Sequence, residues 1–133
     1  MKSDRFDWIL RGGTVVDGLG GEGVRADVGL AGDRIAAVGD LAQAQAANEF
    51  DAAGLLVCPG FIDVHTHSDA YLLIEPGAPS KIRQGVTTEI TGNCGASAAP
   101  RGPGYTMPSD WLEQKYPGDW HSVAEYRALL DAQ

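Results

Sequence analysis

The chain has 133 residues, of which 44% are hydrophobic and 21% are charged, a composition typical of a globular protein rather than a disordered one. Its net charge of -8, with only ten Lys and Arg in all, argues against nucleic acid as a partner, because binding to phosphates needs clustered basic side chains. No stretch approaches the roughly 18 apolar residues of a membrane span, so no membrane partner is expected.

The N-terminus and the cysteines bear on the cellular compartment. Residues 1–8 carry charged side chains and have no apolar core of signal-peptide length. Cys58 and Cys94 are the only cysteines, too few for a disulfide framework, and Cys58 is expected to be a small buried apolar residue. We therefore expect a cytoplasmic protein.

The first part of the chain predicts short strands joined by turns. Strands are expected over 6–10 and 14–16, separated by Gly12 and Gly13, and a hairpin over 27–38 turns at Gly32 and Asp33. The Ala- and Gln-rich stretch 41–48 fits either one or two helical turns or a loop. A further strand is expected over 51–57.

The second part predicts a βαβ pattern, which implies a parallel sheet. A strand over 61–64 leads into a polar loop, Ser80 caps a short helix that ends at Gly85, and a strand covers 86–91. After a long loop over 99–119, Ser122 and Glu125 form a capping box at the start of a helix. No Gly or Pro ends that helix before Gln133, so we expect the chain to stop within an element of a longer protein.

His65 and His67 are candidate metal ligands. In an extended chain, residues two apart point to the same face, so a His-x-His sequence at a strand end aims two imidazoles at one point. Zinc is held by such nitrogens at ~2.0–2.1 Å. The alternative is two unrelated histidines, and His-x-His alone is a weak signal of a metal site. The predicted strand strengthens that signal, because α/β barrels keep their chemistry at the C-terminal ends of strands.

Cys94 follows the next predicted strand, in the corresponding place. A thiolate there would reach a metal held by the two histidines, since zinc accepts sulfur at ~2.3 Å. The alternative is a small buried apolar residue. Gly92 and Gly95 on either side indicate close backbone packing, and spacing alone leaves the two readings equal.

Two carboxylates lie near these residues. Asp63 alternates with His65, so it is either a partner that orients an imidazole or a polar group satisfied at the strand end. Asp69 is expected on the loop, where it would shape the mouth of a pocket. Local turn contacts explain His121 better than metal does, and packing is expected of the aromatic residues Trp111, Trp120 and Tyr126.

The run from Pro59 to His67, PGFIDVHTH, resembles the signature of the amidohydrolase superfamily. In that group the His-x-His closes the first strand of a distorted (β/α)₈ barrel and binds metal. The upstream segments 13–18, 33–39 and 51–54 resemble the small β-sandwich that these enzymes build from both chain ends. The resemblance implies an α/β fold with part of a composite β-sandwich domain over 1–58 and the start of an incomplete TIM-like barrel over 59–133.

A narrower resemblance concerns the segments 81–88 and 91–95, which are similar to those of the N-acyl-D-amino-acid deacylase branch, also called D-aminoacylase. In that branch a cysteine after the second strand is a metal ligand, which would make Cys94 one. The implied cofactor is Zn²⁺, as one or two ions, with other divalent metals as alternatives. The implied substrate is a small N-acyl amino acid.

The resemblance also implies a reaction at a carbon–nitrogen bond other than a peptide bond. A water activated by metal attacks the acyl carbonyl, and an aspartate from the eighth strand passes the proton to the leaving amine. Such a barrel needs about 250 residues, so the catalytic aspartate and the later ligands are not expected among these 133. The chain alone is therefore predicted to be inactive.

Two other functions remain as alternatives. The first is a cyclic-amide hydrolase of the same superfamily, similar to dihydroorotases and hydantoinases, which usually lack the cysteine. The second is a non-catalytic module that binds metal and is complete at 133 residues. The sequence does not predict an oligomeric state.

Overall fold

A computed structural model describes residues 5–133 and divides the chain into two compact units, Met1–Pro59 and Gly60–Gln133. Residues 1–4, which open the segment predicted to lack a signal peptide, lie outside the described residues.

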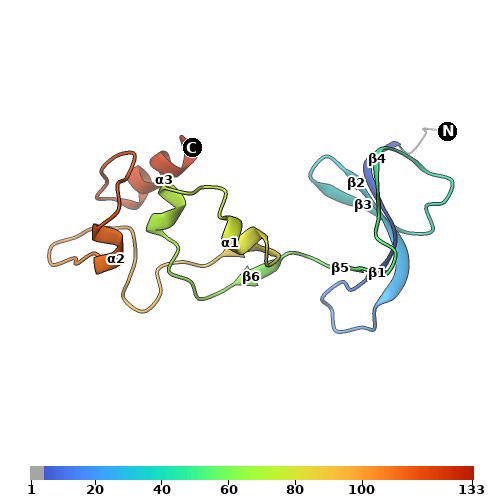
Figure 1. The fold of residues 1–133 in the computed structure, drawn as a ribbon, viewed down its shortest axis with the longest axis horizontal. Helices are drawn as coiled ribbons and strands as arrows, with labels where there is room; N and C mark the ends of the chain where they lie inside the picture. Colours follow the sequence, from blue (N-terminus) through green and yellow to red (C-terminus); the bar gives the residue numbers. More distant parts are fainter. Residues whose placement is uncertain (1–4) are drawn as a thin grey trace. The chain divides into compact units, whose positions relative to one another are not determined.

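The first unit contains one mixed β-sheet (Figure 1). Its strands are β1 (Arg5–Val15), β2 (Val24–Ala31), β3 (Arg34–Gly39), β4 (Gln45–Asp51) and β5 (Leu56–Val57). The order is β3-β2-β1-β4, with β5 also paired to β1. The pairs β1–β2 and β2–β3 are antiparallel, whereas β4 and β5 run parallel to β1.

The expected hairpin is confirmed as β2 and β3, but the prediction of two strands before it was wrong. β1 runs through Gly12 and Gly13, and its register against β2 shifts between Leu10 and Gly13. Gly12 takes a φ of +66°, and a Cβ on Gly13 would lie 2.6 Å from Val57 Cγ2. The two glycines therefore make a bulge in a continuous strand rather than a break.

The stretch 41–48, for which the sequence left helix and loop open, contributes to a strand instead. β4 begins at Gln45 and pairs with β1 over Gln45–Asp51, so the expected strand over 51–57 is replaced by the end of β4 and the two-residue β5. Parallel pairing with β1 overrides the helix preference of Ala and Gln, which local sequence does not reveal.

Arg11 on β1 holds the turn between β3 and β4. Its guanidinium donates to the backbone oxygens of Leu41 and Ala44 at 2.7 and 3.2 Å and pairs with the carboxylates of Asp27 and Glu49. Hydrogen bonding to Arg11 lowers the pKa of Glu49 from its ordinary value. These contacts tie β1 to β2, to β4 and to the turn that precedes β4.

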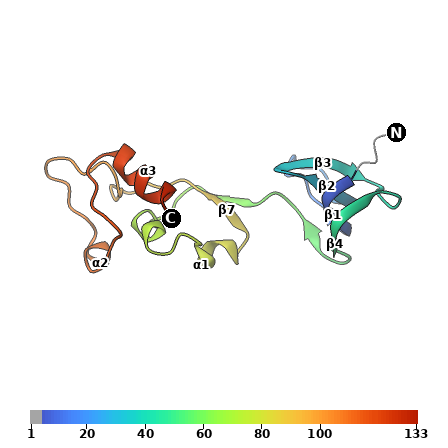
Figure 2. The ribbon, with the colours of Figure 1, turned by 90° about the horizontal axis from the view of Figure 1, so that it is seen from above.

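The second unit combines two short strands with short helices (Figure 2). Its elements are β6 (Phe61–Asp63), the 3₁₀ helix η1 (Ala70–Leu73), α1 (Pro79–Ile82), β7 (Val86–Glu89), α2 (Ser109–Leu112) and α3 (Val123–Asp131). β6 and β7 are parallel, so the predicted βαβ unit is confirmed. Together with the mixed sheet this makes the protein α/β.

Several element boundaries differ from the prediction. β6 and β7 are shorter than expected and end at Asp63 and Glu89. Ser80 lies inside α1 rather than at its cap, because the helix begins at Pro79, whose fixed φ suits a first helical position. The close approach of β6 and β7 depends on Gly60, where a Cβ would lie 2.0 Å from Thr87 Oγ1.

The core of the second unit lies around two tryptophans. Trp111 and Trp120 are each 1% exposed and pack with Ala70, Leu73, Ala98 and Met107, which confirms the packing role expected of them. Tyr126 packs against this cluster from α3, and burial raises its pKa to about 12. No helix among residues 5–133 has the length and hydropathy that crossing a membrane requires.

The predicted capping box at α3 is confirmed. Ser122 Oγ accepts from the Glu125 backbone N–H at 3.2 Å, and the Glu125 carboxylate accepts from the backbone N–H groups of Ser122 and His121 at 2.8 and 2.9 Å. These backbone hydrogen bonds, with one from the Ser122 hydroxyl, lower the pKa of Glu125 to about 2. The cap satisfies amide groups that the helix itself leaves unpaired.

This cap gives a pH-dependent stability. Because the pKa of Glu125 falls from 4.5 to about 2 on folding, its contribution is present above about pH 4.5 and is lost as the pH falls toward 2. Glu125→Gln is expected to lower the melting temperature near neutral pH, with a gap to wild type that closes in acid. Ser122→Ala, which removes the reciprocal bond, is expected to cost about 1 kcal/mol.

Melting curves from neutral pH down to about pH 2 measure the gap, with the exposed Glu113→Gln as control. A gap for Glu125→Gln that stays constant over that range would contradict the assignment of the low pKa to this cap.

Candidate metal centre

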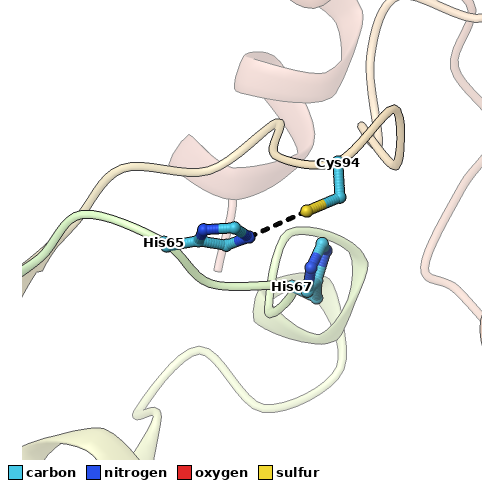
Figure 3. A group of neighbouring side chains, drawn as sticks. All are labelled: His65, His67 and Cys94. Atoms are coloured by element: carbon cyan, nitrogen blue, oxygen red, sulfur yellow. Dashed lines mark hydrogen bonds between the residues drawn. The ribbon is translucent and has the colours of Figure 1, made fainter.

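The three predicted metal ligands lie together in the second unit. The donor atoms of His65, His67 and Cys94 are all within 4.8 Å of one another, and all three residues are exposed. Figure 3 shows the two imidazoles and the thiol turned toward a common point. Among residues 5–133, this is the group of His, Cys, Asp and Glu side chains with the spacing of a metal site.

The distances within the group are close to those of a zinc site. His65 Nε2 lies 2.9 Å from Cys94 Sγ, and the His65 and His67 rings are 5.5 Å apart between centroids at an interplanar angle of 68°. Tetrahedral zinc with bonds of ~2.0–2.3 Å separates its donors by roughly 3.3–3.8 Å. Small side-chain rotations therefore suffice to bring two nitrogens and one sulfur to that spacing, a donor set that zinc favours.

The two histidines reach this arrangement from a loop rather than from the strand end that the sequence predicted. β6 ends at Asp63, and His65 and His67 follow in bent, irregular backbone. Asp63 Oδ1 accepts a hydrogen bond from the His65 backbone N–H at 3.2 Å, which turns the chain directly before the first histidine.

Cys94 lies in a turn five residues beyond the end of β7. It adopts the left-handed conformation with φ +54°, uncommon for a residue with a side chain, and is flanked by Gly92 and Gly95 at φ +83° and +77°. The Asn93 amide donates to Ile90 O at 2.8 Å and to Thr66 O at 3.4 Å. Asn93 thereby links the cysteine turn to the residue between the two histidines.

Asp69, which was expected on a loop at the mouth of a pocket, is a buried residue bonded to the surrounding backbone. It is 2% exposed, and its Oδ2 accepts hydrogen bonds from the backbone N–H groups of Gly92 and Ala98 at 3.0 and 3.4 Å. Its own backbone oxygen accepts from the Tyr126 hydroxyl at 2.6 Å. Asp69 therefore fastens the loop that carries Cys94 to the segment that carries His67.

Asp63 corresponds to the satisfied strand-end group, one of the two roles the sequence left open. Its Oδ2 accepts from Lys81 Nζ at 2.6 Å, and its Oδ1 is used by the His65 backbone rather than by an imidazole. Both hydrogen bonds, that from Lys81 foremost, lower the pKa of Asp63. The hydrogen bond to Asp63 is in turn the main reason for the raised pKa of Lys81.

Sequence reasoning missed Lys81, Glu89 and Ser68. Glu89 lies opposite Asp63 in the β6–β7 register and is 3.3 Å from Lys81 Nζ, and its other oxygen accepts a hydrogen bond from Ser68. A charged residue at the end of a β-branched strand was the available signal for Glu89. Lys81 lies in α1, so its contacts with the ends of β6 and β7 could not be predicted from residues at the strand ends alone.

The remaining candidates lie elsewhere. His121 pairs with Asp119 at 3.6 Å, consistent with the local role expected of it. Cys58 was expected to be buried but is exposed and lies in the first unit. Its place directly after β5 and before Pro59 puts it on connecting backbone rather than in the core.

Comparison with known proteins shows to which family the chain is similar. Residues 48–133, more than half of it, match the profile of the Amidohydrolase family. The chain belongs to the amidohydrolase family. Both the His-x-His loop and the cysteine turn of this amidohydrolase chain lie inside the matched region.

Individual relatives are also similar. D-aminoacylase of Alcaligenes xylosoxydans xylosoxydans is 57% identical over 131 residues, which are 98% of this chain and 27% of the relative. A crystal structure of N-acyl-D-glutamate deacylase from Bordetella bronchiseptica, with zinc and a phosphonate that mimics the tetrahedral intermediate, is 41% identical with a TM-score of 0.86. The match includes 98% of this chain and 27% of the Bordetella chain.

A D-aminoacylase structure that addresses a binuclear metal centre is 49% identical with a TM-score of 0.83, over 94% of this chain and 27% of its own. This amidohydrolase chain thus spans about a quarter of the length of the relatives that it matches.

Proposed function

We propose that this sequence is part of a metal-dependent N-acyl-D-amino-acid deacylase, which converts an N-acyl-D-amino acid and water into a D-amino acid and a carboxylate. The convergence of His65, His67 and Cys94 carries the proposal. It occurs in a chain 57% identical to a D-aminoacylase, and the relatives with zinc and with a binuclear metal centre support a divalent metal here.

The residues present fit one or two zinc ions, with other divalent metals as alternatives. His65, His67 and Cys94 would hold the metal, and their nitrogen and sulfur donors are those that zinc prefers. When bound, the metal supplies Lewis-acid activation for hydrolysis of an amide. Asp63 and Asp69 act on the surrounding backbone, at the amides of His65 and of Gly92 and Ala98.

For the fold of the whole enzyme we propose the two-domain arrangement that the sequence resemblance implied. Residues 1–58 would form part of a composite β-sandwich, and residues 59–133 would provide the first strands of a (β/α)₈ barrel. The parallel β6–β7 pair, with α1 between its strands, supports this because parallel strands linked by helices build such barrels. The substrate would be a small N-acyl amino acid.

A chimera tests the function. The chain replaces the 131 aligned residues of the Alcaligenes D-aminoacylase, and release of free amino acid from N-acyl-D-amino acids is measured with and without zinc. We expect metal-dependent turnover by the chimera and none by the 133 residues alone, since a barrel needs about 250 residues.

Within the graft, Cys94→Ala is expected to lower turnover by at least the roughly 10–100-fold that loss of an outer-shell partner costs. Cys58→Ala, at the other exposed cysteine, is expected to leave it unchanged. A folded, zinc-loaded chimera without turnover would contradict the proposed function.

A further inference from the structure

The ends of β6 and β7 place two carboxylates side by side. Asp63 and Glu89 are directly paired in the parallel register, and their side chains are 27% and 11% exposed. Like charges at paired positions destabilise a sheet, and partial burial strengthens the repulsion because water screens it less. The pair therefore needs a cation.

Lys81 of α1 supplies that cation. Its Nζ lies 2.6 Å from Asp63 Oδ2 and 3.3 Å from Glu89 Oε1, and its side chain is 23% exposed. The same ammonium donates to Thr66 Oγ1 at 2.7 Å. One charged group thus contacts the end of β6, the end of β7 and the residue between the two histidines.

These three contacts lie on the segments that carry the metal donors. His65 follows Asp63 by two residues, Thr66 separates His65 from His67, and Cys94 follows Glu89 by five. Ser68 adds a hydrogen bond from the same loop to Glu89, and Thr66 Oγ1 lies 3.2 Å from Ser68 Oγ. Lys81 therefore joins the histidine loop to the end of the strand that leads to Cys94, beside the direct links that Asn93 and Asp69 make to the cysteine turn.

We propose that Lys81 is a positioning residue of the metal centre, which neutralises Asp63 and Glu89 and holds the His65–His67 loop against the strand that leads to Cys94. This role rests on the proposed function, because it assumes that the three residues bind metal. Lys81 acts on the metal ligands indirectly, through the loop and the strand ends. A variant that tests this role must remove its contacts with Asp63, Glu89 and Thr66.

The test compares zinc affinity and the cobalt spectrum of the full chain. Lys81→Met keeps the length of the side chain but removes its charge, and Lys115→Met is the matched control at an exposed lysine outside the network. Competition with a chromophoric chelator gives the zinc affinity, and the thiolate-to-cobalt charge-transfer band reports whether Cys94 contacts the metal. Melting of the metal-free chain measures stability separately.

We expect Lys81→Met to weaken zinc binding by about 10–100-fold and to reduce the charge-transfer band, with Lys115→Met at wild-type values. A folded Lys81→Met variant with wild-type affinity and spectrum, even at a lower melting temperature, would show a purely structural lysine and overturn the inference. Wild-type chain that binds neither metal would overturn the metal centre itself, which is a different result.

If Lys81→Met does not fold, a second variant tests whether Lys81 positions the metal centre. Thr66→Val removes the hydroxyl that accepts from Lys81 and leaves the three charges in place. We expect weaker zinc binding and a reduced charge-transfer band in this variant as well. An unchanged affinity would count against a role for Lys81 in holding the histidine loop.

Discussion

Replacement of Cys94 by alanine is expected to weaken zinc binding by roughly a hundredfold. Structural zinc sites with four ligands gain on the order of 10–16 kcal/mol, or about 3 kcal/mol for each ligand, and each 1.4 kcal/mol is a factor of ten. Cys94 is the sulfur donor of the group and lies 2.9 Å from His65 Nε2. Its loss leaves two imidazoles that approach each other from one loop.

His67→Ala is expected to have an effect of similar size, since it also removes one donor of three. Zinc titration against a chelator measures both variants. Cys58→Ala and His121→Ala serve as matched controls, because both residues are exposed and lie outside the group. If neither Cys94→Ala nor His67→Ala changes the zinc affinity, these residues are not the ligands.

Truncation of Trp120 is expected to cost the second unit about 3–5 kcal/mol of stability. The side chain is 1% exposed, and its Nε1 donates to Ala98 O at 2.6 Å. Tyr116 packs edge-on at 5.2 Å between centroids, and the Arg101 guanidinium stacks over the indole at 3.5 Å. Alanine would leave a cavity and an unpaired carbonyl in a core that contains few other large residues.

Urea unfolding followed by tryptophan fluorescence measures this loss, since Trp111 remains as a reporter in the same core after Trp120 is replaced. Trp120→Phe separates the two contributions, because it keeps most of the volume and is expected to cost about 1–3 kcal/mol for the orphaned Ala98 carbonyl. Trp8→Ala, at a residue 43% exposed in the first unit, is the control. Equal midpoints for Trp120→Ala and wild type would contradict this account of the core.

Local patterns predicted the elements that local interactions build. The hairpin of β2 and β3 follows from Gly32 and Asp33 at the turn, and the start of α3 follows from Ser122 and Glu125. β4 escaped prediction because its pairing with β1 joins segments about 40 residues apart, and its Ala- and Gln-rich sequence carries no strand signal of its own. The bulge at Gly12 and Gly13 likewise depends on β2 and β5 on either side of β1.

The same distinction between local patterns and contacts of distant segments applies to the residues of the candidate site. His65 and His67 were candidates because of their His-x-His spacing, whereas for Cys94 the spacing left two readings equal and only the resemblance to the deacylase branch favoured a ligand; the structure brings the three side chains together. Asp69, Asn93 and Lys81 join different segments of the chain through side-chain contacts. No spacing rule predicts such contacts, so the supporting residues appear only once the loops are placed.

The measurement that tests the central claim most directly is X-ray absorption at the zinc edge of the metal-loaded full chain. Binding by His65, His67 and Cys94 predicts one sulfur neighbour at ~2.3 Å and nitrogen neighbours at ~2.0–2.1 Å, with the sulfur shell lost in Cys94→Ala and kept in Cys58→Ala. A shell of nitrogen and oxygen alone in the wild-type chain, or a sulfur that persists in Cys94→Ala, would contradict the assignment of this metal centre.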